Sequence, residues 1–355
     1  MEERIASLVG VSEVVFPLPE LFWAVRAFVE QLARRGPLVV RLDDLHWAED
    51  TLLDLLDHLV EGDAPVLLLG TARGDLRERR PDLAEGHGRL DLVLGPLPPE
   101  QAAGLLDGLI GGQLPPAARD RIVHAAAGNP LFVEQLLSML VDTGRIVRSG
   151  GRWRVQGDLA DLAVPPSVEA VVAARVDELP DAQRAVLEPA AVAGEEFASG
   201  AVRELAADDV REAVPEHLRA LAGRQMVEQI EEPDAASDHR FAHPMIRDVT
   251  YGGLLKRTRA ELHERFVRWA ESTDLARDRP LEVEEVLGYH LEQAHRLRID
   301  LGPLDGHGLD LGRRAAGRLG AAGRRALERG DMPAAANLLR RAAGVLPEDL
   351  SLIHI

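Results

Sequence analysis

The chain has 355 residues, of which 46% are hydrophobic and 28% charged, so we expect a globular protein of two to three domains at about 150 residues per domain. Its 59 acidic and 41 basic residues leave a net charge of −18, which would repel a phosphate backbone and disfavours direct DNA binding. There is no cysteine, which excludes disulfides and zinc–thiolate sites, and no run of roughly 20 apolar residues, so we expect a soluble, cytoplasmic protein with no membrane partner.

The first 95 residues alternate between helical and extended patterns. Apolar residues at helical spacing predict a helix over 19–35, and a short apolar run over 38–42 predicts a buried strand. A leucine-rich helix follows over 50–60, a second strand over 66–71, and a weaker third strand over 90–94. Strands that alternate with helices predict a parallel α/β sheet.

From residue 98 onward, helical patterns replace the strands. Residues 144–155 predict a β-hairpin around a glycine pair, and the helix-then-hairpin pattern of 214–241 suits a winged helix. Residues 312–346 predict two alanine-rich helices about Gly330–Asp331, a pair of about the length of one tetratricopeptide (TPR) unit. The fold class is therefore α/β followed by a mostly α region.

Two adjacent acids at the end of the first strand are the strongest chemical signal. We assign Asp43 to a Mg²⁺ ion and Asp44 to the orientation of an attacking water, although both could equally be turn acids before the next helix. Thr71 and Arg73, after the second strand, could contact a γ-phosphate, but a lone arginine is more often a solvated loop residue. Arg41 lies on the same side of its strand as Asp43, and an ion pair between them would compete with Mg²⁺.

A second polar pattern lies just downstream of the acid pair. Its members recur every four residues and are His46, Asp50, Asp54 and His58. The spacing could bring metal ligands onto one helix face, but a solvated polar face opposite the leucines explains it better.

Lysine content limits how the chain could hold a nucleotide. The single lysine, Lys256, follows no glycine-rich turn, so the 355 residues contain no phosphate-binding loop of the form G-x-x-x-x-G-K-[ST].

Several segments together resemble the ATPase region of the STAND class (signal-transduction ATPases with numerous domains) of P-loop, AAA-type NTPases. LVVRLDDLHWAED resembles the Walker B segment, LLLGTARGD the sensor-1 strand, and AAGNPLFVEQLL the family's GxP motif. The segments VPPSVEAVVAARVDELPDAQRAVLEPAAVAGEEF and HRFAHPMIRDVTY resemble its winged helix. RDVTYGGLLKRTRAELHERFVRWAE and GYHLEQAHRLR are most similar to the ATPase segments that follow bacterial class III adenylate/guanylate cyclase domains.

The resemblance assigns roles to four residues of this sequence. It makes Asp43 the Mg²⁺-associated acid, Asp44 the catalytic, water-orienting acid, and Arg73 the sensor-1 position. Thr71 is added to the residues expected to bind ATP because of its place at the end of the same strand. Pro130 would lie near the adenine. The P-loop and its strand are expected upstream of Met1, so the chain looks like a fragment.

The same resemblance predicts a division into five segments. Residues 1–97 would be the C-terminal part of a P-loop ATPase core with Walker B and sensor 1, and 98–143 a helical subdomain with the Gly-Asn-Pro motif. Residues 144–275 would be winged-helix-like, and 276–349 the start of a TPR-like array. Residues 350–355 read like a translated sequencing adapter and are excluded from the fold.

The implied function is a nucleotide-dependent regulatory switch with ATP and Mg²⁺ as cofactors, linked in cis to a class III adenylate/guanylate cyclase or another output domain. A protein partner would bind the TPR-like region. The alternatives are the ATPase module of a LuxR-type transcriptional regulator and a nonenzymatic, degenerate scaffold. We expect ATP hydrolysis from the full-length protein and none from this fragment.

Overall fold

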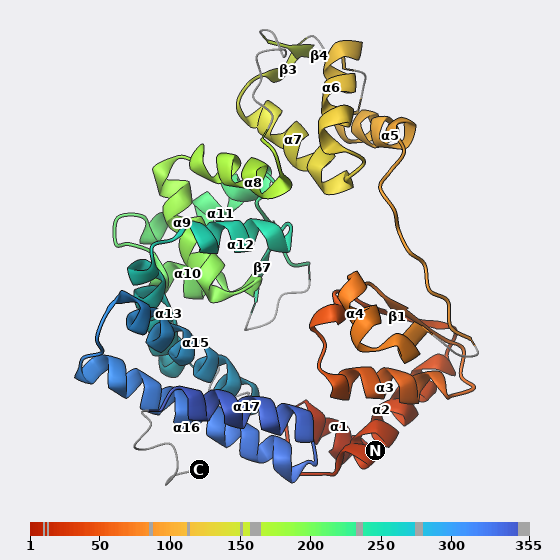
Figure 1. The fold of residues 1–355 in the computed structure, drawn as a ribbon, viewed down its shortest axis with the longest axis vertical. Coiled ribbons are helices and arrows are strands. Elements are labelled where there is room, and N and C mark those ends of the chain that lie inside the picture. Colours follow the sequence, from red (N-terminus) through yellow and green to blue (C-terminus); the bar gives the residue numbers. More distant parts are fainter. Residues whose placement is uncertain are drawn as a thin grey trace. The chain divides into compact units, whose positions relative to one another are not determined.

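The chain forms two compact units, each described here by itself (Figure 1). The computed structural model describes residues 1–346 except 10, 13, 85–87, 112–113, 150–151, 157–164, 232–236 and 274–279. Unit 1 comprises Met1–Leu92 and Ala270–Ile355, and unit 2 comprises Val93–Trp269. The predicted adapter-derived segment 350–355 lies outside the described residues. The five-segment division stays a prediction.

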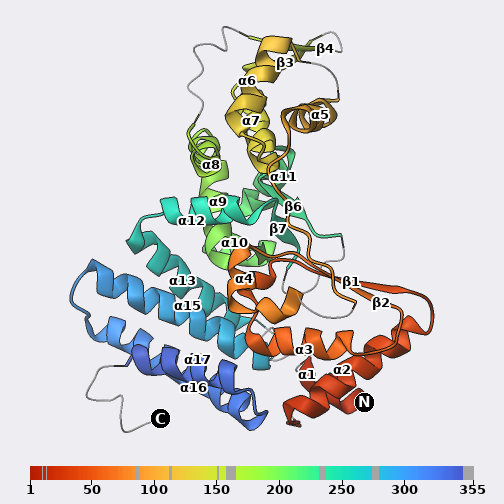
Figure 2. The ribbon, with the colours of Figure 1, turned by 45° about the vertical axis from the view of Figure 1, so that its right-hand side comes forward.

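The first part of unit 1 is a two-stranded parallel sheet with helices on one side. Strands β1 (Leu38–Leu42) and β2 (Val66–Gly70) pair in parallel, from Leu38 opposite Val66 to Leu42 opposite Gly70. Helices α2 (Leu18–Ala33) and α3 (Asp50–Val60) lie beside the strands (Figure 2). These four elements confirm the predicted ones to within two residues, so local apolar spacing was sufficient to define them.

The described residues cover one face of the sheet only, which corrects the prediction that 38–42 is a buried strand. Leu42 and Leu68 pack on a small apolar cluster of Leu53, Leu56 and Leu76. On the opposite face, three apolar side chains are between 50% and 60% exposed, namely Val39, Leu67 and Leu69. A strand covered on one face shows alternating burial, as β1 does.

The predicted third strand over 90–94 is wrong. These residues are described and form no strand, and the side chains of Leu90, Leu92, Val93 and Leu94 are between 72% and 92% exposed. A strand needs a hydrogen-bonded neighbour and a face to bury, and this segment has neither among the described residues.

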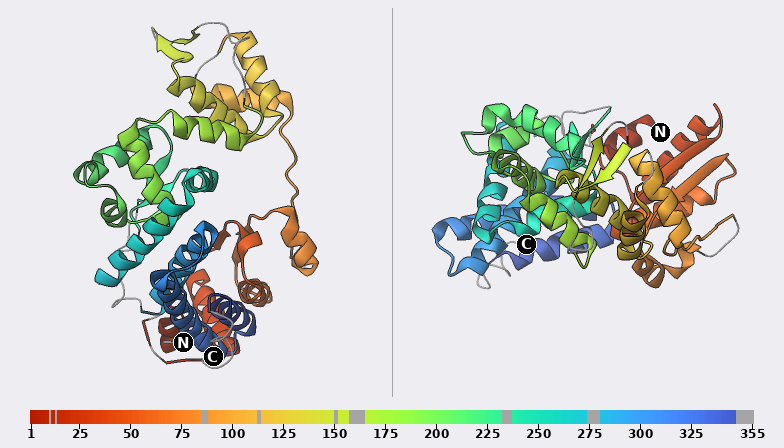
Figure 3. Two further views of the ribbon diagram at one scale, coloured as in Figure 1. Left: turned by 60° about the vertical axis from the view of Figure 1, so that its left-hand side comes forward. Right: turned by 90° about the horizontal axis from the view of Figure 1, so that it is seen from above.

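The remainder of unit 1 is helical. Its further elements are α1 (Glu2–Leu8), η1 (Leu45–Trp47), α4 (Gly74–Arg79), η2 (Pro81–Ala84), α15 (Pro280–Leu301), α16 (Gly306–Glu328) and α17 (Met332–Gly344). Helices α15, α16 and α17 pack on one another along the chain (Figure 3). A Cβ at Gly312 would lie 2.6 Å from the Val345 carbonyl oxygen, so glycine permits this close approach. The two predicted alanine-rich helices are confirmed.

Unit 2 consists of helices with two small antiparallel sheets. Its helices are α5 (Pro99–Ile110), α6 (Pro116–Ala126), α7 (Pro130–Asp142), α8 (Val168–Asp177), α9 (Asp181–Ala193), α10 (Ser199–Leu205), η4 (Arg211–Ala213), α11 (Val214–Gly223) and α12 (Pro244–Gly253), and α13 (Lys256–Ser272) continues into unit 1. The predicted hairpin strands are β3 (Ile146–Ser149) and β4 (Arg152–Val155), and a three-stranded sheet has the order β5 (Glu196–Phe197), β7 (His239–Phe241), β6 (Val227–Gln229).

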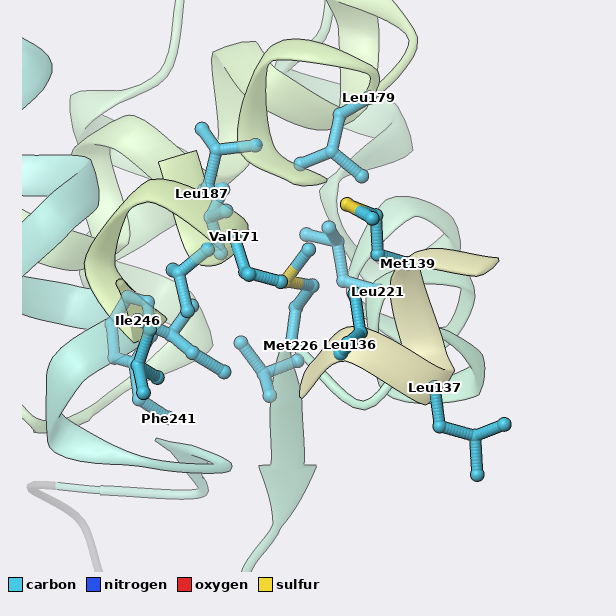
Figure 4. Close-up of a cluster of buried hydrophobic side chains, with 14 of the residues drawn as sticks. Leu136, Leu137, Met139, Val171, Leu179, Leu187, Leu221, Met226, Phe241 and Ile246 are labelled. Atoms are coloured by element: carbon cyan, nitrogen blue, oxygen red, sulfur yellow. The ribbon is translucent and has the colours of Figure 1, made fainter. Parts of the chain in front are cut away.

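A single apolar core holds unit 2 together. Leu136 and Val171 come from α7 and α8, and Leu187, Leu221 and Ile246 from the helices that follow (Figure 4). All five are almost fully buried, so helices far apart in sequence share one core. No helix among the described residues is both long enough and apolar enough to cross a membrane.

One charged side chain lies inside this core. Arg175 on α8 is 2% exposed; its Nε donates to Asp142 Oδ2 at 3.2 Å and its Nη2 donates to the Arg224 carbonyl oxygen at 2.6 Å. The side-chain oxygen of Gln135 accepts a third hydrogen bond. Burial lowers the pKa of Arg175, while Asp142 opposes that shift. The guanidinium thus ties α7, α8 and the end of α11 together.

We predict that Arg175→Leu lowers the free energy of unfolding of unit 2 by about 3–5 kcal/mol, because Asp142 loses its buried partner. Chemical denaturation should show this loss, and Arg175→Leu/Asp142→Leu should recover much of it. The exposed pair Arg203–Glu212 is the control, since Arg203→Leu should cost less than about 1 kcal/mol. Equal losses of unfolding free energy in Arg175→Leu and Arg203→Leu would contradict the stabilising role of the buried Arg175–Asp142 pair.

Acid should destabilise unit 2 through His263. This residue is fully buried, its Nε2 lies 2.8 Å from the Tyr251 hydroxyl, and burial together with Arg247 and Arg259 lowers its pKa from 6.5 to about 3. Below pH 6.5 the His263 imidazole binds a proton in the unfolded chain but stays neutral in the folded chain. The free energy of unfolding therefore falls by up to about 1.4 kcal/mol per pH unit. Denaturation at pH 6.5 and 5 should show a smaller loss for His263→Gln than for the wild type.

Candidate functional site at the carboxyl end of the sheet

The acid pair lies at the carboxyl end of β1, beside the end of β2. The register that places Leu42 opposite Gly70 also brings Asp43 next to Thr71. The Thr71 hydroxyl donates to Asp43 Oδ1 at 3.3 Å, and the Thr71 backbone N–H donates to the Leu42 carbonyl oxygen at 2.9 Å. Because carboxyl ends of parallel strands meet at one edge, two segments 28 residues apart form one polar site.

Thr71 also fixes the backbone after Asp43. Asp44 has a left-handed conformation with φ 57°, which aspartate tolerates better than most residues. Its backbone N–H donates to the Thr71 hydroxyl at 3.0 Å, and the N–H of Leu45 donates to the Thr71 carbonyl oxygen at 2.8 Å. These two bonds hold a turn that directs the Asp43 and Asp44 side chains differently.

Arg41 forms the ion pair that its strand position predicted. Its Nη2 lies 2.7 Å from Asp43 Oδ2, and both side chains are at least half exposed. An exposed pair of this kind contributes at most about 1 kcal/mol. The guanidinium therefore occupies one oxygen of Asp43 but can be displaced by a competing cation.

His46 was misread from the sequence. It lies in η1, its imidazole is 2% exposed, and Nδ1 is 3.7 Å from Asp44 Oδ1. The four-residue spacing does not extend through η1, because the helix begins only at Asp50. His46 is thus buried, whereas Asp54 pairs with Arg80 at 2.9 Å and His58 approaches Glu61 at 3.8 Å. No three His, Cys, Asp or Glu side chains converge as metal ligands within the described ranges.

The other two predicted site residues, Arg73 and Pro130, do not contact the acid pair among the described residues. Arg73 precedes α4, is exposed, and has no ion pair within the described part of the chain. Pro130 belongs to unit 2, where it begins α7 after Asn129, whose side chain accepts from the Phe132 N–H at 3.2 Å. The helix-opening interpretation of Pro130 is confirmed, and its nucleotide role stays a prediction.

The donor atoms at the sheet edge suit Mg²⁺ in part. Asp43 and Thr71 present a carboxylate and a hydroxyl, which are the hard oxygen donors that Mg²⁺ prefers, and Mg²⁺ usually keeps several waters. Arg41 would first have to release Asp43 Oδ2. For a triphosphate the fit is incomplete, because the 355 residues provide no P-loop lysine.

The helix after the acid pair is attached to the turn between α16 and α17. Thr51 Oγ1 donates to Asp331 Oδ1 at 2.7 Å, and Asn337 Nδ2 lies 3.5 Å from Glu49 Oε1. Burial and nearby Asp331 and Glu285 raise the pKa of Glu49. A polar cavity of about 190 Å³ lies beside these groups. Sequence periodicity gave no sign of this contact, because its residues are 280 positions apart.

The comparisons with known proteins identify no family. No family model matches the chain. An uncharacterized protein of Rhizobium meliloti (strain 1021) is 28% identical over 257 residues, which cover 67% of this chain and 23% of that protein. The chain thus spans less than a quarter of the length of the relative it matches.

A solved structure gives a weaker likeness. The crystal structure of a STAND protein with a tetratricopeptide repeat sensor from Pyrococcus horikoshii matches with a TM-score of 0.42 and 12% identity, over 92% of this chain and 52% of that one. These values do not establish a common fold.

Thr71→Val should lower the free energy of unfolding of unit 1 by about 0.5–1.5 kcal/mol, because the Asp44 N–H and Asp43 Oδ1 both lose the hydroxyl. Thermal unfolding of the two variants Thr71→Val and Thr71→Ser measures this effect. Serine keeps the hydroxyl and should remain close to wild type. A valine variant as stable as the serine variant would show that the hydroxyl does not hold the turn.

Proposed function

We propose that this chain is part of a signal-transduction ATPase of the STAND class, in which bound ATP and Mg²⁺ set the state of a regulatory switch. Differential affinity of two conformations for the nucleotide would drive such a switch. The supporting observation is the pair of acids at the carboxyl end of β1, joined to the end of β2 by Thr71.

The proposed roles of the two acids agree with the surroundings of each carboxylate. Asp43 has a partly exposed carboxylate beside a hydroxyl, so it is assigned to a water-mediated contact with Mg²⁺. Asp44 points its exposed carboxylate from a fixed left-handed turn and is assigned to the attacking water. When bound, Mg²⁺ neutralises charge on the phosphates. Arg73 and Pro130 are assigned to the nucleotide by resemblance, and Thr71 by its place directly after β2.

The phosphates require groups that this chain does not supply. We infer that a P-loop with its lysine belongs to the natural protein upstream of Met1. The length of the Rhizobium meliloti relative is compatible with further segments. The 355 residues alone are then expected to be inactive.

The finer parts of the proposal rest on sequence resemblance. The output would be a class III adenylate/guanylate cyclase domain in cis, and the segment 144–275 a winged helix. Helices α16 and α17 would begin a TPR-like array that binds a protein partner. The two helices pack closely, as one such unit would.

A nonenzymatic scaffold is the second candidate. The ion pair between Arg41 and Asp43 favours it, because a guanidinium at 2.7 Å occupies the oxygen that Mg²⁺ would need. The scaffold predicts no ATP binding by the natural full-length protein, and the switch predicts Mg²⁺-dependent binding.

The test is to express the natural full-length protein and measure ATP binding and hydrolysis with and without Mg²⁺. Asp44→Asn should lower kcat by at least about 100-fold and leave the Kd for ATP within about threefold, because the water loses its orienting carboxylate. Asp50→Asn is the matched control, since Asp50 is a neighbouring exposed carboxylate near Arg79. Absence of ATP binding in the wild type would support the scaffold.

A further inference from the structure

His46 is a buried polar side chain that has no hydrogen-bond partner among the described residues. Its side chain is 2% exposed, and neither Nδ1 nor Nε2 makes a hydrogen bond to any described residue. The buried histidines His263 and His295 differ, because a Tyr251 hydroxyl at 2.8 Å and a Gly308 carbonyl oxygen at 2.9 Å satisfy them. Buried polar groups without partners are uncommon and call for an explanation.

The surroundings of His46 keep its ring in place. Arg79 Nη2 donates to the Ala48 carbonyl oxygen at 2.7 Å, and Arg79 Nη1 donates to the His46 carbonyl oxygen at 3.4 Å, so the backbone of η1 is held from α4. The ring of Trp47 lies 5.1 Å from the imidazole, centroid to centroid. The imidazole therefore cannot reach solvent unless the turn opens.

One polar group lies just beyond hydrogen-bond distance from the ring. Asp44 Oδ1 is 3.7 Å from Nδ1, and its carboxylate is 53% exposed with no hydrogen bond to a described residue. The Asp44 backbone is fixed through Thr71, while no hydrogen bond from a described residue holds its side chain. A small rotation of Asp44 would close the gap and satisfy Nδ1.

We propose that His46 is a positioning residue, whose Nδ1–H binds one oxygen of Asp44 and so aims the other oxygen at the attacking water. This inference rests on the proposed ATPase function. A carboxylate free to rotate orients a water poorly, whereas one held by a fixed donor presents its second oxygen in a defined direction. Burial keeps water from competing for Nδ1.

The test compares His46→Asn with His46→Leu in the natural full-length protein. The asparagine amide can replace Nδ1 as a donor, and leucine has a similar branched shape without a donor. His46→Leu should lower kcat for Mg²⁺-dependent ATP hydrolysis by about 10–100-fold and leave the Kd for ATP within about twofold. His46→Asn should retain kcat within about fivefold of wild type. Melting temperatures of both variants are measured in parallel.

His58 offers a matched control. Its Nδ1 lies 3.8 Å from Glu61 Oε2, so it forms a similar histidine–carboxylate pair away from the acid pair, and His58→Leu should leave kcat unchanged. If His46→Leu unfolds, His46→Phe replaces it, because phenylalanine fills the ring volume without a donor.

The outcomes separate this inference from the proposed function. A wild type that does not hydrolyse ATP overturns both. An active wild type whose kcat survives His46→Leu overturns the positioning role alone, as does an equal loss in the asparagine and leucine variants or a loss that follows melting temperature. A kcat loss confined to the leucine variant supports it.

Discussion

The parallel pairing of β1 with β2 is the constraint on which the candidate site depends. Side chains alternate along a strand, so a shift of one residue would move Arg41 and the end of the strand to the opposite face. The observed register sets Leu42 opposite Gly70, and a Cβ at Gly70 would lie 2.5 Å from a Leu45 methyl carbon. The sheet therefore brings Thr71 within reach of both acids. The absence of a side chain at Gly70 leaves room for Leu45, in the turn after β1, to pack over the end of β2.

The carboxylate of Asp43 can bind either the Arg41 guanidinium or a cation at this edge of the sheet. Asp43 is shared by Arg41 and Thr71, and the ion pair is too exposed to be strong. A divalent cation that retains its waters could compete with the guanidinium, because Mg²⁺ carries twice the charge. Asp44 is different, since among the described residues its carboxylate approaches the buried imidazole of His46. The two adjacent acids thus have distinct surroundings.

The sequence predicted these elements well where the signal was local. Apolar spacing located α2, β1, α3 and β2, and strand alternation predicted the Arg41–Asp43 pair. Prediction from the sequence failed where burial depended on segments far apart in the chain. In the part of the chain that the structure describes, the apolar run over 90–94 has no partner strand, and no layer covers the side of the sheet on which Val39 is exposed. His46 was assigned to a solvated face because helical periodicity was extended across a turn of different geometry.

The segment from η1 to α3 connects the acid pair to the helical part of unit 1. Asp44 leads directly into η1, and the first turn of α3 is bound through Thr51 to Asp331, between α16 and α17. A helix transmits displacement along its axis because its backbone hydrogen bonds keep it rigid. The connection includes the hydrogen bonds Thr51–Asp331 and Asn337–Glu49, each of which contributes about 0.5–1.5 kcal/mol. Loss of these side-chain contacts would leave the backbone hydrogen bonds between Thr71 and the turn after β1 intact. The acid pair is thus held directly by its own sheet and is connected to α16 and α17 through η1 and α3.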